Sequence, residues 1–352
     1  MSIKPMLDGL ARAPWRDVAR VMLIRAGYAV TRGYSATVED LAKQKPDAKK
    51  IAALESGLIE HLVAGEKYVQ VIKLLPGERS KVEQWIKSKR TYANDLTAVF
   101  PGVAPESKIT PLRHLEPTAA GFVQTEVGIA ALFTAARSFV KTVPVPASDL
   151  KPAAAAGFEK IVGYKNVFVQ TYEAIWLPPK LDVVVLCVDY PPEGATQSFP
   201  LPNAAFLTAT VRKMLGRAIQ KANFWQAIDG LYQGPDGKLV DYGFSAGGQS
   251  VNHHRARRKT SVCLRKAVYD AAGAAAIAAS GKSLELFKAA MQWQLKHADG
   301  VLVDPEVMIS GVARDLNKAS PVVDHCVVRD CLTTGDLAFV LSKVLPHIKN
   351  WV

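Results

Sequence analysis

Cysteine is scarce in this chain. The 352 residues contain four cysteines, Cys187, Cys263, Cys326 and Cys331, and no C-x-x-C spacing. This number is too small for a disulfide scaffold and favours a reducing compartment. Cys326 and Cys331 lack the second ligand pair that a tetrahedral zinc site needs. We therefore predict no metal site and no cofactor.

Long apolar runs and internal repeats are also missing. No stretch approaches the roughly 20 apolar residues that span a bilayer, and no fixed-period repeat points to a solenoid or a propeller. The first apolar run, residues 21–24, lies between Arg20 and Arg25 and is too short for a signal-peptide core. The sequence therefore predicts a cytoplasmic protein without a membrane partner.

The composition is that of a globular chain. Hydrophobic residues make up 49% of it and charged residues 22%, enough to bury a substantial core. Its 24 glycines and 21 prolines are close to ordinary usage, which excludes low-complexity classes. At roughly 150 residues per domain, the length predicts two domains or lobes.

Periodicity predicts an α+β fold that is mainly α. Helical spacing of apolar residues predicts helices over 48–63, 78–90, 128–141 and 203–222, and a mostly helical tail from 251. Residues 67–75 read as a short strand, whereas 166–177 and 180–190, separated by Pro178 and Pro179, read as an antiparallel β-hairpin. We expect two helical lobes with this hairpin between them.

Proline-rich residues 143–152 suggest an interlobe linker. The expected domains are an N-terminal helical lobe over 1–145, a linker and β-hairpin over 146–200, and a C-terminal helical lobe over 201–352.

Positive charge is in excess and concentrated. Lysine and arginine number 44 against 32 acidic residues, a net charge of +12. Residues 202–266 hold eleven cations against three acids, and residues 67–90 hold seven against two. Clustered cations can neutralise adjacent phosphates and release their counterions, so a polyanionic partner is indicated.

Nucleic-acid contacts are predicted where these cations gather. Flexible polar residues at 247–252 lead into a dense cationic run, and three cations recur every four residues in the helix expected at 203–222. The predicted contact residues are Lys87, Lys89 and Arg90; Lys213, Arg217 and Lys221; and Asn252, Arg255, Arg257, Arg258 and Lys259. We expect the stretches near residues 87 and 255 to line one cleft.

A competing hypothesis is hydrolytic. Residues 243–247 match G-x-S-x-G, in which a sharp strand-to-helix turn exposes the serine, here Ser245. That motif requires several β-α units upstream, whereas the preceding chain reads as mainly helical. An exposed glycine-rich loop is the favoured interpretation, and no catalytic residue is predicted.

The order of features resembles the nucleocapsid proteins of segmented negative-strand RNA viruses, the phenuivirus and tenuivirus group in particular. The residues that carry the resemblance are Ala26-Gly27-Tyr28, 64–67, 76–87 and 115–122. The resemblance implies two mainly helical lobes, a basic RNA groove between them, and an N-terminal arm at residues 1–14 that docks on the next protomer. It assigns no individual site residue.

These observations predict a non-enzymatic protein that self-associates into oligomers or filaments and coats single-stranded RNA, or another nucleic acid, with little sequence preference. Its expected location is the cytoplasm, or the virion if the resemblance holds. Two alternatives stay open: a viral shell or scaffold protein whose basic patch faces the genome, and a serine hydrolase.

Overall fold

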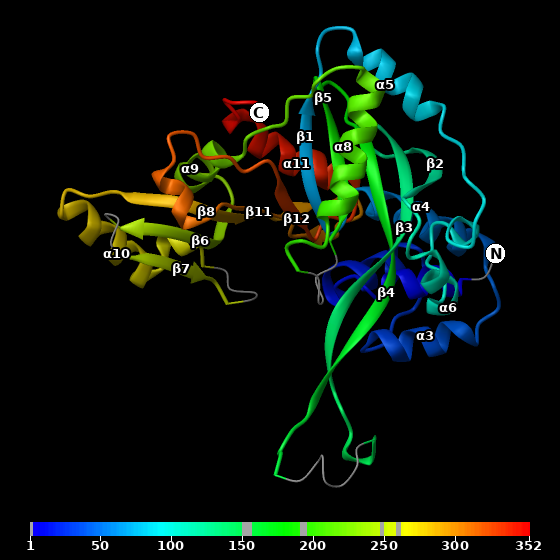
Figure 1. Cartoon of the computed structure of the whole chain (residues 1–352). Coiled ribbons are helices and arrows are strands. Elements are labelled where there is room, and N and C mark those ends of the chain that lie inside the picture. The colour runs from blue at the N-terminus through cyan, green and yellow to red at the C-terminus, as the bar shows by residue number, and fades with distance from the viewer. Residues whose placement is uncertain (1–2, 150–156, 191–195, 247–249, 258–261) are drawn as a thin grey trace.

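A large antiparallel sheet organises the molecule (Figure 1). The computed structural model describes residues 3–149, 157–190, 196–246, 250–257 and 262–352. Ten strands follow the order β2-β3-β4-β5-β1-β12-β11-β8-β6-β7, and all of their pairings are antiparallel. The strands of this sheet are β1 Lys67–Lys73, β2 Thr118–Gln124, β3 Ile129–Pro144, β4 Val162–Leu177, β5 Val183–Asp189, β6 Lys238–Ala246, β7 Val251–Arg255, β8 Leu284–Gln292, β11 Glu306–Ser310 and β12 Cys326–Arg329.

A short ribbon and a set of helices complete the secondary structure. Strands β9 (Leu295–Lys296) and β10 (Leu302–Val303) pair with each other. The described α-helices are α1 Lys4–Leu10, α2 Arg20–Arg25, α3 Tyr34–Ala42, α4 Ala48–Ala64, α5 Glu78–Lys87, α6 Glu106–Ile109, α8 Leu201–Leu215, α9 Trp225–Gln233, α10 Val268–Ala279 and α11 Thr334–Val344.

Helices α5 and α8 cover one face of the sheet. Val82 and Ile86 of α5 and Leu207 and Val211 of α8 pack with apolar residues of β1, β3, β4 and β5, such as Ile72. Proline at the start of α8 suits a position whose backbone N–H would have no helical partner. Gly216, with φ of +74°, ends the helix in the left-handed conformation that glycine adopts most easily.

The opposite face carries the main core. Apolar residues of α4, α9 and α11 pack there against strands from both halves of the sheet, including Leu132, Trp176 and Val307. Helix α11 begins with a capping box between Thr333 and Asp336, which satisfies two backbone N–H groups. Helices α1 to α4 form a neighbouring apolar cluster.

The expected mainly α fold is wrong, because a ten-stranded sheet dominates the structure. The predicted helix at 128–141 is β3, and the tail after residue 251 contributes β7, β8, β11 and β12. The inner half of β3, residues 129–136, is buried on both faces. Such a strand reads as a continuous apolar run, which periodicity cannot separate from a buried helix.

Several local predictions are confirmed. Residues 166–177 form most of β4, and 180–190 contain β5; the two strands pair antiparallel, with Ala174 opposite Cys187. The strand expected at 67–75 is β1, and the helices expected at 48–63 and 78–90 are α4 and α5. Each of these segments has strong apolar patterning bounded by glycine or proline, which explains why local signals sufficed.

The sheet does not divide at residue 145, where the sequence suggested a linker. Strand β1 pairs on one side with β5 and on the other with β12, so the three expected domains share a single sheet. The N-terminal segment also belongs to this body, because Met6, Leu7 and Leu10 are buried in its own core. The described part of the expected N-terminal arm, residues 3–14, therefore packs against its own chain.

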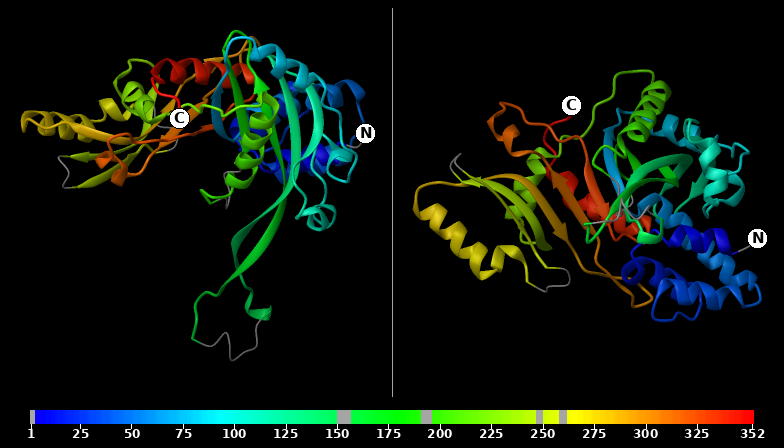
Figure 2. Two further views of the ribbon diagram at one scale, coloured as in Figure 1. Left: turned by 45° about the horizontal axis from the view of Figure 1, so that its top comes forward. Right: turned by 60° about the horizontal axis from the view of Figure 1, so that its bottom comes forward.

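A projecting hairpin, which we call the arm, occupies the region expected to be the linker. It comprises the outer halves of β3 and β4, residues 138–149 and 157–168 as far as the structure describes them. Figure 2 shows it extending away from the sheet and the covering helices. Residues 138–144 alone span about 23 Å at 3.3 Å per residue. The arm is paired internally but is not covered by the body.

Burial differs sharply along β3 and predicts a matched pair of mutational effects. Leu132 is fully buried, whereas Val140 in the arm is 56% exposed. We expect Leu132→Ala to lower the free energy of unfolding by about 2–5 kcal/mol because it leaves a cavity. Val140→Ala should change it by about 1 kcal/mol or less. Urea denaturation would measure both, and equal losses would contradict the arrangement.

Candidate nucleic-acid interface

The two cationic stretches expected to share a cleft lie in different parts of the sheet. Arg255 ends β7, the terminal strand, whereas Lys87 ends α5, which packs on β3, β4 and α8. Seven strand spacings separate β4 from β7, about 34 Å at 4.8 Å each. Figure 1 shows β7 and α5 on opposite sides of the molecule. The expected common cleft is therefore wrong.

The cations of the predicted helix at 203–222 also diverge. Because α8 ends at Gly216, Arg217 and Lys221 lie beyond it and do not continue the face of Lys213. Arg217 makes a two-pronged ion pair with Glu78, with both N···O distances at 2.6 Å, and these hydrogen bonds hold the pKa of Glu78 below its usual value. Lys221 lies 3.4 Å from Asp324. Lys213 alone of the three lines a groove.

The remaining predicted residues have mixed surroundings. Lys87 pairs with Glu83, Lys89 lies over the Trp85 ring, and Arg90 donates to nearby backbone carbonyls. Asn252 donates to Ser250. Arg255 is 70% exposed and only 3.9 Å from Asp241, and Arg257 is also exposed. Arg258 and Lys259 lie outside the described residues.

An open groove of about 660 Å³ lies where the arm leaves the body. Its floor is β3 at Ala135–Arg137, one wall is α8, and the other is the loop at 113–117 before β2. Arg113, Arg137 and Lys213 line it against a single acid, Glu116. The volume falls within the range of small-molecule and cofactor sites, roughly 300–1,000 Å³. The groove thus combines an open volume of this size with an excess of cations.

Arg137 is the best-anchored cation of the groove. Its guanidinium donates to the Phe199 carbonyl and lies 5.7 Å from the Phe199 ring centre. Burial lowers its pKa and nearby Glu173 opposes this, but an arginine stays protonated at neutral pH. Its buried Nε has no hydrogen-bond partner among the described residues. A fixed charge with unused donor capacity suits an incoming anion.

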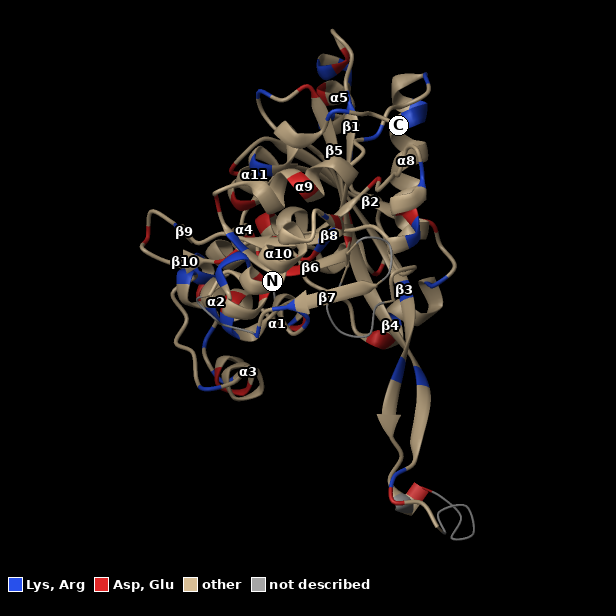
Figure 3. Ribbon diagram, turned by 90° about the vertical axis from the view of Figure 1, so that its left-hand side faces the viewer, with Lys and Arg blue, Asp and Glu red and all other residues tan. Residues whose placement is uncertain are grey.

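The arm extends this cationic floor. Side chains alternate along a strand, so Arg137, Phe139 and Lys141 share one face of β3, and Lys141 is directly opposite Lys165 of β4. Lys141 and Lys165 are exposed. Figure 3 shows lysine or arginine on both strands of the arm, and α8 carries Arg212 and Lys213 in its last turn. Arg137 thus belongs both to the groove and to this face of the arm. We call the cations of the two surfaces, Lys213, Arg113, Arg137, Lys141 and Lys165, the basic track.

Four residues of the basic track were not among the contact residues predicted from the sequence. Arg113 lies in a proline-rich loop, and Arg137, Lys141 and Lys165 lie on strands, outside the densest cationic segments. Treating 128–141 as a helix placed Arg137 and Lys141 one turn apart at the end of a buried element. As a strand, the same segment places Arg137, Phe139 and Lys141 on one face and brings Lys165 of β4 opposite Lys141, a pairing that a helix over 128–141 could not indicate.

Ser245 lies inside β6, where it pairs with Val251 of β7 and Glu285 of β8. Ser245 is buried, with 5% of its surface exposed to solvent. A nucleophile elbow instead places its serine in a sharp turn between a strand and a helix. The geometry at Ser245 is that of a buried strand position.

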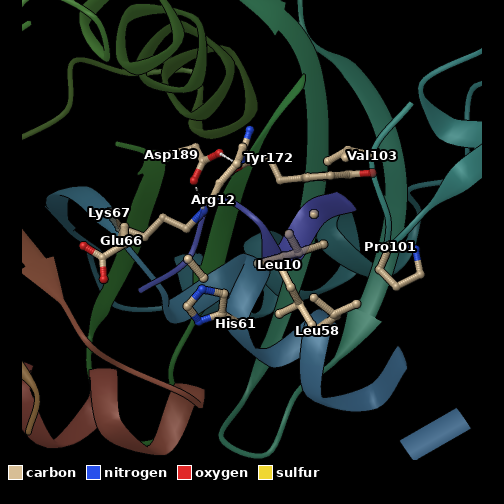
Figure 4. Close-up of a pocket in the computed structure, with 13 residues that line it drawn as sticks. Leu10, Arg12, Leu58, His61, Glu66, Lys67, Pro101, Val103, Tyr172 and Asp189 are labelled. Carbon is tan, nitrogen blue, oxygen red and sulfur yellow. Dashed lines mark hydrogen bonds and ion pairs between the residues drawn. The ribbon is translucent and has the colours of Figure 1, made fainter. Parts of the chain in front are cut away.

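A second, enclosed cavity of about 40 Å³ lies beneath the N-terminal segment (Figure 4). Asp189 accepts from Arg12 at 2.6 Å and from Lys67 at 3.2 Å. Burial alone would raise the pKa of Asp189, but the charges of Lys67 and Arg12 outweigh it and hold the pKa below its usual value. The space suffices only for a few water molecules. This cluster ties the N-terminal segment to β1 and β5.

Burial raises the pKa of two neighbouring carboxylates, Glu66, which lines this cavity, and Asp330. Burial and the nearby Asp330 raise the pKa of Glu66 to about 8, and burial together with Glu306 raises that of Asp330 to about 7. Glu66 Oε1 accepts the backbone N–H of Asp330, which fixes the two residues together. Ionising either one in the folded state is therefore unfavourable.

Within the described ranges, no group of three or more histidine, cysteine, aspartate or glutamate side chains is arranged to hold a metal ion. The described helices include none that is both long and apolar enough to cross a membrane.

Comparison with models of known protein families finds no match. A search of curated proteins also finds no similar sequence. The nucleocapsid resemblance therefore stays a prediction.

The raised pKa of Glu66 makes stability depend on pH. A buried acid of this kind favours the folded state below its unfolded pKa of 4.5, and this contribution is lost as the pH rises through about 8. We expect the free energy of unfolding to fall between about pH 5 and pH 8, and to fall less in Glu66→Gln, whose amide oxygen can still accept from the Asp330 backbone N–H. Urea denaturation across this range measures it. Parallel pH profiles for both proteins would contradict the assignment.

Proposed function

We propose that this protein is a non-enzymatic, nucleic-acid-coating protein that binds single-stranded RNA along the basic track and self-associates. The observation that carries the proposal is the groove at the root of the arm, with Arg113, Arg137 and Lys213 around one acid. Clustered cations on a continuous surface favour a chain of phosphates over a single small anion, because each neutralised phosphate releases counterions.

The charge elsewhere supports this choice of site. Arg217 and Lys221 are paired with Glu78 and Asp324, so they offer less to an added phosphate. Lys213 and Arg113 are exposed and make no ion pair among the described contacts. Phosphate contacts of this kind carry no sequence information, which fits binding with little sequence preference.

Self-association is the second part of the proposal. The arm exposes Val140, Val162 and Tyr164 on one face, opposite the face that holds its lysines. At the far end of the sheet, β7 has no strand on its outer edge within the described chain, and α10 has no buried residue. One copy cannot bring these two regions together, because they belong to distant parts of a single sheet.

A second copy is the partner that fits both surfaces. Helix α10 carries one charged residue, Asp270, which is bonded to His254 and Tyr242, so its outer surface is apolar and uncharged, like that face of the arm. Val268 and Tyr269 at its start are 88% and 78% exposed. The arm of one copy docking on α10 and β7 of the next would bury both apolar surfaces and repeat head to tail.

Charge reversal in the groove tests the RNA site. The double variant Lys213→Glu with Arg113→Glu should raise the Kd for a single-stranded RNA 20-mer at least about tenfold, and should reduce the slope of log K against log salt by about 1 to 1.5. Fluorescence anisotropy at several salt concentrations measures both. Lys45→Glu with Lys49→Glu is the control, because both lysines are exposed around the start of α4 and the change in net charge is identical. Equal losses in the two variants, or no binding by the wild type, would refute the site.

Complementation between two variants tests the self-association. Without nucleic acid and at 0.5 M salt, the wild type should show a mass that grows with concentration, whereas Tyr164→Asp and Tyr269→Asp should each stay near the chain mass of 38.1 kDa. Mixing the two variants should restore a dimer, because each supplies the surface that the other lacks. Tyr92→Asp, an exposed tyrosine outside both surfaces, is the control. Light scattering after gel filtration gives the masses; a monomeric wild type or a monomeric mixture would contradict head-to-tail docking.

A further inference from the structure

The groove at the root of the arm has an apolar interior as well as a cationic lining. Phe206 of α8 lines it together with Leu115, Ala135 and Ala136, and Phe206 is only partly buried. A surface that served phosphates alone would need no such interior, because a phosphate gains nothing from contact with apolar carbon. The mixed lining indicates a ligand with both an anionic and an apolar part.

Phe206 is held rigidly from behind. Its ring packs edge-on against Phe133 at 5.6 Å between centroids, and Phe133 in turn lies 6.4 Å from Trp85 of α5. This row of three rings crosses from α5 through β3 to α8 and fixes the angle of the outermost ring. A preorganised aromatic face needs little ordering when a planar ligand stacks on it.

Polar groups lie beside this aromatic surface. Asn203 lines the groove, and its side-chain amide donates to Glu173 Oε1 at 2.6 Å. Glu173 is fully buried with its Oε2 unpartnered among the described atoms, and burial raises its pKa to about 7. Arg137 also reaches the groove with a buried, unpartnered Nε. Glu173 lies behind Asn203 and does not line the groove itself, so the unused polar group of the lining is the Arg137 Nε–H.

We propose that the groove accepts an unpaired nucleobase that stacks on Phe206 while the flanking phosphates contact Arg113, Arg137 and Lys213. This rests on the proposed function and gives it a chemical reason for single strands. In a duplex the bases are stacked on each other and paired, and cannot enter the groove. Every base has a π-face, so the stacking selects single strands without selecting a sequence.

Oligonucleotides with and without bases test the inference. Wild type should bind a 12-mer of uridine or adenosine roughly 5–150-fold more tightly than an abasic 12-mer of the same charge, the range expected for stacking of one base. Phe206→Leu, which keeps an apolar side chain but removes the ring, should lose most of that preference. Its affinity for inorganic polyphosphate should stay unchanged, because that probe has no base. Tyr92→Leu, at an exposed tyrosine outside the groove lining and outside both self-association surfaces, is the control.

The outcomes separate this inference from the proposed function. Equal affinity for the base-bearing and abasic chains, or an equal loss of oligonucleotide and polyphosphate binding in Phe206→Leu, would overturn base insertion and leave the phosphate track intact. Failure of wild type to bind any of the three probes would overturn the track as well. Quenching of 2-aminopurine fluorescence on binding, reduced in Phe206→Leu, would support stacking directly.

Discussion

The continuous pairing of β3 with β4 is the constraint on which the rest of the structure depends. Sixteen residue pairs, from Ile129 with Leu177 to Pro144 with Val162, join the two strands without interruption. The inner half is buried between two helical layers, and that burial supplies the free energy that a two-stranded ribbon lacks in water. The buried inner half therefore fixes the register of the exposed outer half. The groove lies at residues 135–137 of β3, where the buried part of the strand ends.

The sequence predicted the elements whose signals are local and missed those that depend on neighbours. Strand β1 and helices α4 and α5 were found because each has clear patterning and a marked end. Strand β3 was mistaken for a helix because residues on both of its faces, such as Leu132 and Ala135, are buried. This removes the alternation of apolar and polar residues that marks a strand. When a sheet is assembled from strands that are distant in the chain, their pairing cannot be read from any short stretch of sequence.

In the candidate site, too, the sequence predicted what depends on local composition and missed what depends on folding. Counting charge found Lys213 and the basic character of the chain, but not which cations are already paired. Arg217 meets Glu78 from a segment 139 residues away, so its pairing was invisible before folding. Conversely, Arg113 and Arg137 lie outside the richest clusters and become important through their placement around one groove. Local charge density indicates that a chain is basic, but it does not show which cations are left unpaired after folding.

The position of β1 at the middle of the sheet has a consequence for biosynthesis. Lys67 pairs with Val328, so one edge of β1 stays open until 261 further residues have been made. At roughly 5–20 residues per second, this interval lasts about 13–52 seconds. The first half of the sheet, with β1 at its border, thus leaves the ribosome with an unpaired strand edge, the kind of surface on which aggregation begins, until β12 pairs with it.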